Sequence, residues 1–178
     1  FMLLTHSDSD HCGGLDEVLE VKGAGVVYAP LIENPAINAE YAAFYAAVTK
    51  SDAEAVVSRR YLQISSQSEA YPYTLTFLWP FGGENQGETP YDKVNGGDYT
   101  DADVNDTSAV VWLDYSGTSA LFCGDATARV EEALIRDCEL GFFVETGVEL
   151  NSTEILKVSH HGSATGTSES FAAYLNVK

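Results

Sequence analysis

The feature that most constrains this chain is a polar segment, residues 5–14, that directly follows an apolar run at residues 1–4. A strand that ends in a turn directs alternate side chains to one side, so polar groups two residues apart converge there. The segment holds four side chains able to bind a metal ion, and these are His6, Asp8, Asp10 and His11. The pattern therefore predicts a strand that carries a cluster of metal ligands at its carboxyl end.

Two glycines, Gly13 and Gly14, separate this cluster from a helical pattern at residues 15–19. Glycine allows the backbone to pass close to a bound group. The positive N-terminal end of the expected helix would point back at the cluster and favour an anionic group of a substrate there.

The chain has four histidines in all, and the other two are adjacent, His160 and His161, in the segment KVSHHGS. Between the two pairs, an apolar strand pattern runs into Gly124 and Asp125. We expect one of the adjacent histidines to bind metal and the other to face the substrate, and the sequence leaves open which does which. Asp125 is predicted as a metal ligand, with the N-cap of the following helix as the alternative.

These motifs are HxDxDHxGG, a strand ending in Gly-Asp, and HHGS, and in this order they resemble the metallo-β-lactamase superfamily, from Leu3 to about Leu175. The chain is most similar to the hydrolase domain of ComEC/Rec2-type competence proteins, a likeness that includes residues 105–108. The resemblance implies an α/β fold, an αββα sandwich of two sheets, with one hydrolase domain over residues 1–178. Such domains have strands before and after these points, so we expect a sandwich truncated at both ends and a longer parent protein with membrane segments.

The resemblance also implies how the ligands divide between two divalent ions. The first ion would be held by His6, Asp8 and Asp125. The second ion would be held by Asp10, His11, Asp125 and either His160 or His161. Asp125 would then bridge the two ions. We assign catalysis to Asp10, His160 and His161.

Two positions depart from the commoner pattern of the superfamily. Asp8 stands where a second histidine is usual, and no histidine lies between His11 and His160, where another ligand would be expected. Asn105 and Asp106 fall roughly where that ligand belongs. Carboxylate oxygens suit Mn²⁺ or Mg²⁺, and imidazole suits Zn²⁺. We therefore expect Mn²⁺ or Mg²⁺ in the oxygen-rich first site, and Zn²⁺ as an alternative in the second.

The chain is strongly acidic, with 27 Asp plus Glu against nine Lys plus Arg and a formal net charge of −18. This balance argues against broad, salt-driven binding of nucleic acid, which depends on Lys and Arg that neutralise phosphates. It does not exclude phosphodiester chemistry, because two bound divalent ions would be the largest local charges in the site.

Cysteine usage and hydropathy leave the compartment open. The three cysteines show no CxxC spacing, so no disulfide framework is expected. No apolar run approaches the ~18 residues that span a bilayer, and no signal peptide precedes the first motif.

Hydrophobic periodicity predicts further strands and helices. The expected strands lie at residues 26–30, 61–64, 74–79, 109–115, 120–122 and 154–158. The expected helices lie at residues 38–48, 127–138 and 168–175, with one more that starts in a capping-box pattern at Ser51. The segment from residue 81 to residue 106 has no periodicity and is expected to be a long acidic loop.

The motifs predict a metal-dependent hydrolase in which two divalent ions activate water for attack on an ester. The resemblance implies a phosphodiesterase or nuclease that acts on DNA during uptake, on the extracytoplasmic face of the membrane. A domain outside such a system is expected in the cytoplasm. Two alternatives stay open. One is hydrolysis of another ester, such as a phosphorylcholine ester, a lactone or a thioester, and the other is a catalytically silent interaction domain of a membrane transporter.

Overall fold

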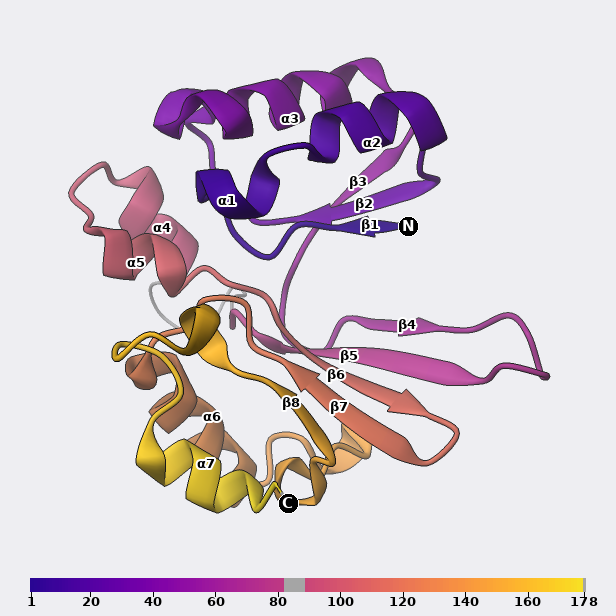
Figure 1. Ribbon diagram of the computed structural model, residues 1–178, viewed down its shortest axis with the longest axis vertical. Coiled ribbons are helices and arrows are strands. Elements are labelled where there is room, and N and C mark those ends of the chain that lie inside the picture. The colour runs from indigo at the N-terminus through magenta and orange to yellow at the C-terminus, as the bar shows by residue number, and fades with distance from the viewer. Residues whose placement is uncertain (82–88, 178) are drawn as a thin grey trace.

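A computed structural model describes residues 1–81 and 89–177 of the chain, which form two β-sheets between two groups of helices (Figure 1). The strands are β1 (Met2–Leu3), β2 (Val26–Ala29), β3 (Glu54–Val57), β4 (Gln63–Ser65), β5 (Tyr73–Trp79), β6 (Val110–Tyr115), β7 (Thr118–Phe122) and β8 (Ile155–Lys157). The α-helices are α1 (Ser9–Cys12), α2 (Leu15–Lys22), α3 (Ala39–Lys50), α4 (Pro90–Asn95), α5 (Asp101–Asn105), α6 (Ala128–Glu139) and α7 (Glu169–Leu175). Short 3₁₀ turns are η1 (Pro35–Ile37), η2 (Val144–Thr146), η3 (Leu150–Ser152) and η4 (Ser159–Gly162).

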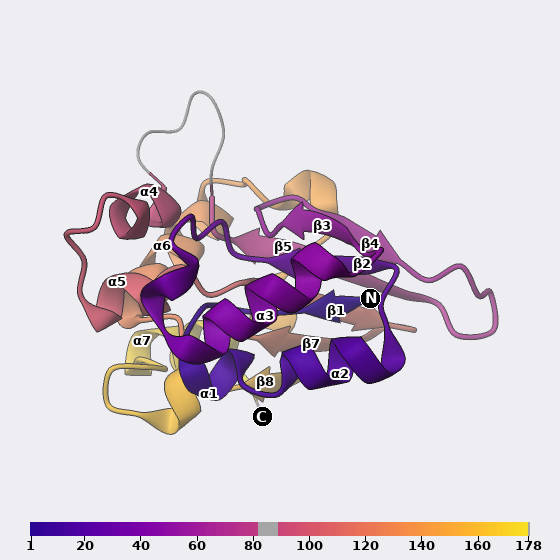
Figure 2. The same cartoon turned by 90° about the horizontal axis from the view of Figure 1, so that it is seen from above.

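The elements are arranged as a layered sandwich. Helices α2 and α3 cover the outer face of the sheet β1-β2-β3, and α6 and α7 cover the outer face of the sheet β4-β5-β6-β7-β8 (Figure 1 and Figure 2). The two sheets face each other through an apolar cluster, to which the larger sheet contributes Phe77 and Val111 and the smaller sheet Leu3 and Tyr28. This αββα arrangement confirms the fold class that the sequence predicts.

The smaller sheet is parallel throughout, and α2 and α3 make the crossovers that parallel strands require. Val27 in β2 is buried in the apolar cluster beneath both helices. Asn38 caps α3, because its side chain accepts a hydrogen bond of 2.7 Å from the Tyr41 N–H. The predicted strand at residues 26–30 and the predicted helix at residues 38–48 are confirmed, with ends that differ by one or two residues.

The larger sheet is antiparallel from β4 to β7, and β8 joins it parallel to β7. Ser116 and Gly117 connect β6 to β7 with positive φ angles of 53° and 85°, which is the conformation of a two-residue hairpin turn. The outer face of this sheet packs on α6 and α7. Trp112 of β6 and Leu121 of β7 lie in the same apolar cluster as Leu134 of α6. The predicted hairpin and both predicted helices behind it are confirmed.

The prediction of a helix that starts at Ser51 is wrong. Ser51 ends α3, because its N–H donates to the carbonyls of Ala47 and Val48. Its hydroxyl accepts a hydrogen bond from the Ala53 N–H. The next residues, Glu54–Val57, form β3 and pair with β2. A serine before acidic residues occurs at both ends of helices, and here the two β-branched valines of the segment favour a strand.

The prediction of a long loop over residues 81–106 is wrong for the described part, which contains α4 and α5. Each helix starts with a capping box, in which a threonine and the aspartate three residues later exchange hydrogen bonds. Tyr91 and Val94 of α4 are buried in the cluster that also holds α3. Helices this short are below the length at which periodicity is detectable. Residues 82–88 of the expected loop lie outside the described residues.

Within residues 1–81 and 89–177, no helix has both the length and the apolar character needed to cross a membrane. Helices α3 and α6 have 12 residues each, whereas a span requires about 20.

Burial of α6 against the larger sheet predicts a strong dependence of stability on Leu134, which has no exposed surface. Leu134→Ala should lower the free energy of unfolding by about 3 kcal/mol, because it removes buried methyl groups and leaves a cavity. Leu140, which lies just beyond the same helix and is 64% exposed, is the matched control. Leu140→Ala should change the free energy of unfolding by less than about 0.5 kcal/mol. Urea unfolding of both variants measures the difference. Equal losses would contradict the assigned packing of α6.

Candidate metal centre

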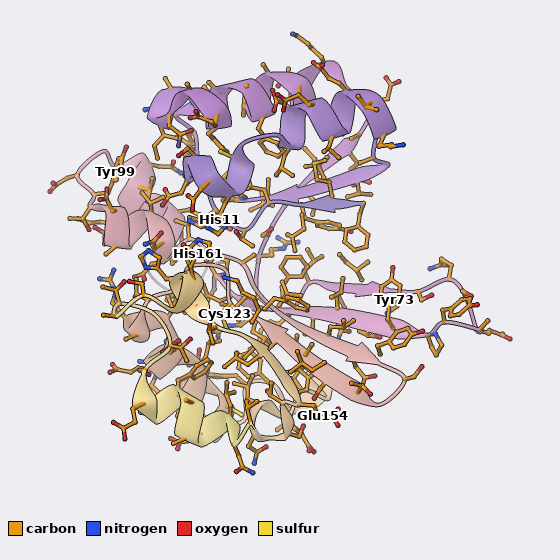
Figure 3. All side chains as sticks on the ribbon, in the orientation of Figure 1. His11, Tyr73, Tyr99, Cys123, Glu154 and His161 are labelled. Carbon is orange, nitrogen blue, oxygen red and sulfur yellow. The ribbon has the colours of Figure 1, made fainter. Side chains whose placement is uncertain are left out.

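Three chain segments meet at one end of the sandwich: the residues after β1, the turn after β7 and the residues after β8. Strands β7 and β8 are parallel neighbours, so their carboxyl ends lie at the same edge of the larger sheet. The first segment is joined to the larger sheet by a hydrogen bond of 2.9 Å from the Ala109 N–H to the Thr5 carbonyl. Figure 3 shows the result, with His11 and His161 next to each other between α1 and η4.

Gly124 allows the turn after β7 to pack directly against the first segment. A Cβ at this position would lie 2.9 Å from the Ser108 Cβ and 3.2 Å from the Thr5 Cβ, and the φ of +55° disfavours any other residue. The Gly124 carbonyl accepts hydrogen bonds from the His160 N–H at 3.1 Å and from the Lys157 ammonium at 2.9 Å. One residue therefore touches all three segments and sets the position of the aspartate that follows it.

His11 lies at the centre of the resulting cluster. Its Nε2 is 3.2 Å from Asp125 Oδ1 and 3.6 Å from Asp10 Oδ2. The same atom is 3.1 Å from His161 Nε2. Ligand atoms that all lie within 4.8 Å of one another form two overlapping groups, which are His6, His11 and Asp125, and Asp10, His11 and His161. The fold thus brings together side chains from all three sequence motifs.

Asp8 lies at the edge of this cluster. Its Oδ2 is 3.5 Å from the Nε2 of His6, which is fully buried, and its own side chain is 38% exposed. Asp8 belongs to neither group of converging ligand atoms. Its assignment to the first ion therefore stays a prediction, in which the carboxylate would reach the ion from beside His6.

The two adjacent histidines have different surroundings. His161 Nε2 lies 3.3 Å from Asp10 Oδ2 and 3.3 Å from Asp125 Oδ2. His160 Nε2 is more distant from the same Asp125 oxygen, at 3.9 Å, and its Nδ1 lies 2.8 Å from the Thr165 hydroxyl. The geometry therefore favours His161 as the metal ligand and leaves His160 beside it, held by a threonine.

The backbone at both histidines is left-handed. The φ angles are 46° at His160 and 53° at His161, and Gly162 continues the run at 78°. Residues with a Cβ pay about 1–2 kcal/mol for this conformation, and such strain is concentrated at functional sites. The turn directs both imidazoles toward Asp125, which accounts for the unfavourable backbone.

The described part of the cluster contains buried ligand atoms that lack a hydrogen bond of normal geometry. His6 Nε2 and Asp125 Oδ1 are both buried without a hydrogen bond of normal geometry among the described residues. A buried polar atom in this state is costly, and most such atoms in proteins are satisfied. Both atoms belong to the same converging group, and a divalent cation would satisfy them together. The residues present therefore fit a bound metal ion.

Protonation states also suit metal binding. Burial of the imidazole lowers the pKa of His11, and the neighbouring His6 lowers it further, so His11 is held in its neutral form. Partial burial opposes ionisation of Asp10, but a hydrogen bond from its own backbone N–H and the adjacent imidazoles hold the pKa of Asp10 below its usual value. Neutral imidazole and ionised carboxylate are the forms that coordinate metals.

Two residues at the centre were not identified from the sequence, Lys157 and Thr165. Besides its contact with Gly124, the Lys157 ammonium lies 3.8 Å from Asp125 Oδ1. The sequence signal that could have identified Lys157 is its position at the end of a strand. That strand lies next to the one that leads into the Gly-Asp turn. The contact of Thr165 with His160 depends on how the loop after the histidines folds back, which the spacing of the residues does not encode.

Asp106 does not supply the missing ligand of the commoner pattern. Its carboxylate accepts a hydrogen bond of 2.5 Å from the Thr127 hydroxyl and is paired with Arg129. With Trp79 it lines a cavity of about 620 Å³ that none of the cluster residues borders. The alternative role for Asp125 is also wrong, because the N-cap residue of α6 is Thr127.

Metal binding is the first expectation from this geometry. Tag-free wild-type protein loaded with Mn²⁺ or Zn²⁺ and then desalted should retain about one or two ions per chain, because the cluster offers two overlapping ligand sets. An Asp10→Ala/His11→Ala double variant should retain far less, and Asp52→Ala, an exposed acid outside the cluster, should match wild type. Elemental analysis measures the content. Equally low metal in wild type and double variant would refute the site.

Metal affinity should also depend on pH. Coordinating imidazoles must be neutral, so affinity should fall by up to about tenfold per pH unit for each one that becomes protonated, starting near ~6.5. Burial lowers the pKa of His11, so its share of the loss should begin at lower pH than for an ordinary histidine. Calorimetric titration of Mn²⁺ at pH 8, 7, 6 and 5 measures this. Constant affinity over that range would count against histidine ligation.

Comparison with known proteins agrees with the site. The sequence profile of the Metallo-beta-lactamase superfamily matches residues 2–178. Among curated proteins, none gives a significant match to the chain. The superfamily consists of metal-dependent hydrolases that usually bind divalent metals, and the chain has histidine and aspartate groups able to hold them. On its profile match, its two-sheet fold and its ligand groups, this chain belongs to the metallo-β-lactamase superfamily.

Proposed function

We propose that the chain is a metal-dependent phosphodiesterase that acts on DNA in a competence-type uptake system. The hydrolase is supported by the convergence of imidazoles and carboxylates from three segments. Among the described residues, His6 Nε2 and Asp125 Oδ1 are buried there without a hydrogen bond of normal geometry. The phosphodiester substrate is supported by the carboxylate-rich ligand set and by the likeness of the three motifs to ComEC/Rec2-type domains. Hard oxygen ligands suit the ions that commonly serve phosphoryl chemistry.

In this proposal the ligands divide between two ions as the resemblance to the superfamily implies, with His161 as a ligand and His160 not. The first ion would be held by His6, Asp8 and Asp125, and the second by Asp10, His11, Asp125 and His161. Bound divalent ions would supply Lewis-acid activation of water and stabilisation of negative charge on the substrate oxygens. Substrate binding and proton transfer would depend on side chains of the protein.

His160 is proposed to face the substrate. The Thr165 hydroxyl lies 2.8 Å from its Nδ1 and would donate to it, which places the ring proton on Nε2. That nitrogen faces the centre, and the side chain is 31% exposed. It would donate a hydrogen bond to a phosphate oxygen or give a proton to the leaving alcohol.

Asp10 is proposed to take up the proton of the attacking water. Its side chain is 64% exposed, and its pKa is below the usual value, so it is ionised at neutral pH. Its Oδ2 lies 3.3 Å from His161 Nε2, and this contact holds the carboxylate at the exposed side of the cluster.

Lys157 supports an anionic substrate. It is a partly exposed cation at the centre of a chain with a net charge of −18. Arg60 and Arg129 are paired with Asp137 and Asp106 and are less able to bind a phosphate. Attraction of DNA would therefore be local to the metal centre and Lys157, so duplex binding should be weak, with a shallow salt dependence.

The departure at Asp8 provides the functional test. With an oxygen-rich first site, hydrolysis of single-stranded DNA, duplex DNA or a chromogenic phosphodiester should be fastest with Mn²⁺. Asp8→His should shift the preference toward Zn²⁺, because imidazole suits Zn²⁺ better than a carboxylate does. Asp52→His, an exposed substitution outside the cluster, is the control and should leave the metal preference unchanged. The measurement is a matrix of rates by metal and variant.

Asp125→Ala should reduce activity with either ion by more than about 100-fold, since a methyl group cannot hold two mutually repelling ions. Undiminished activity in Asp125→Ala would contradict the two-ion mechanism. A folded, metal-loaded wild type that hydrolyses none of the three substrates would contradict the phosphodiesterase and favour the other esters.

A further inference from the structure

Glu131 is a buried carboxylate next to the segment that carries the adjacent histidines. The proposed chemistry does not use it. It lies on α6 with no exposed surface. The buried acids Asp106 and Asp137 each have an arginine partner, whereas the described contacts of Glu131 are with two serines. Burial raises the pKa of Glu131 above its usual value, and the contacts with the serines offset only part of this rise. An unpaired acid is a costly choice at a position where an apolar side chain would pack without penalty.

The two serines are the ends of the segment that carries the adjacent histidines, residues 159–168, here termed the histidine loop. Glu131 Oε2 accepts a hydrogen bond of 2.7 Å from the Ser168 N–H at the start of α7. The Ser159 hydroxyl lies beside the carboxylate. Ser159 Oγ and Glu131 Oε1 are both buried, and neither has a hydrogen bond of normal geometry among the described residues.

Contacts inside the histidine loop connect its two ends to the residues that hold the imidazoles. The Ser159 N–H donates to the Thr167 hydroxyl at 2.8 Å. Gly166 lies against the Ser159 carbonyl so closely that a Cβ would be 2.5 Å from its oxygen. Thr165, next in the chain, contacts His160 Nδ1. These contacts pack the loop against itself, and its left-handed backbone at the histidines requires support from surrounding residues.

We propose that Glu131 is a positioning residue for the metal centre, which fixes both ends of the histidine loop and thereby holds His161 against Asp125. The inference rests on the proposed metal centre and is independent of the DNA substrate. Residues behind a metal ligand commonly contribute 10–100-fold to metal affinity by orienting that ligand. Here the support acts on the two ends of the loop, at the Ser159 hydroxyl one residue before the histidines and at the Ser168 N–H.

The test compares Mn²⁺ affinity and melting temperature of the full chain for wild type and three substitutions of Glu131. Glu131→Leu should weaken Mn²⁺ binding about 10–100-fold. Glu131→Asp keeps the charge but withdraws the carboxylate by one methylene, and it should weaken binding about tenfold. Glu131→Gln should stay within about threefold of wild type, because its amide oxygen can accept from the Ser168 N–H and its NH₂ group can donate to Ser159 Oγ.

Asp137→Asn is the matched control, since Asp137 is a second buried acid on the same helix, paired with Arg60. It should lower the melting temperature and leave Mn²⁺ affinity unchanged. Affinity lost equally in Asp137→Asn and the Glu131 variants would reduce the effect to general stability and overturn the inference. Wild-type affinity in folded Glu131→Asp would overturn it as well, even where Glu131→Leu fails to fold. If wild type itself binds no Mn²⁺ or Zn²⁺, the metal centre fails and the inference falls with it.

Discussion

The close packing of Gly124 against the first segment is the constraint on which the metal centre depends. With a left-handed φ and no side chain, this residue lets the turn after β7 reach within contact of Thr5 and Ser108. Its carbonyl oxygen accepts hydrogen bonds from the His160 N–H and the Lys157 ammonium. The third segment is therefore held at the same residue. Asp125 follows directly and comes to lie among imidazoles from both ends of the chain. A substitution at Gly124 would therefore separate the ligands without altering any one of them.

The electrostatics of the chain are organised around this point. Its large negative charge would repel nucleic acid, and Arg60 and Arg129 are occupied by buried or partly buried aspartates. Lys157 lies instead beside Asp125, among the candidate metal ligands. Two features are costs to the fold: the buried ligand atoms without a hydrogen bond of normal geometry among the described residues, and the left-handed turn at His160. A bound cation would offset the first cost directly, and it would account for the second, because the strained turn would then direct an imidazole ligand at it.

Much of the fold could be predicted because the strands and the longer helices have strong hydrophobic periodicity, and the three motifs indicated which side chains meet. The failures have local causes. Ser51 begins a pattern shared by helix starts and helix ends, and α4 and α5 are too short to show a period. The choice between His160 and His161 depends on a backbone reversal that no spacing encodes. The roles proposed for Lys157 and Glu131 rest on contacts with distant segments, so only the three-dimensional arrangement reveals them.

The most direct test of the account is the position of a bound ion. Crystals of the wild-type protein soaked in Mn²⁺ and measured for anomalous scattering should show a peak about 2.0–2.4 Å from an Asp125 carboxylate oxygen, with a His11 nitrogen in the same coordination shell. A second peak on the other side of Asp125 would establish the bridged pair. Well-ordered Asp125 and His11 side chains with no peak between them, or manganese bound only elsewhere on the acidic surface, would contradict the central claim that the three motifs converge to hold metal.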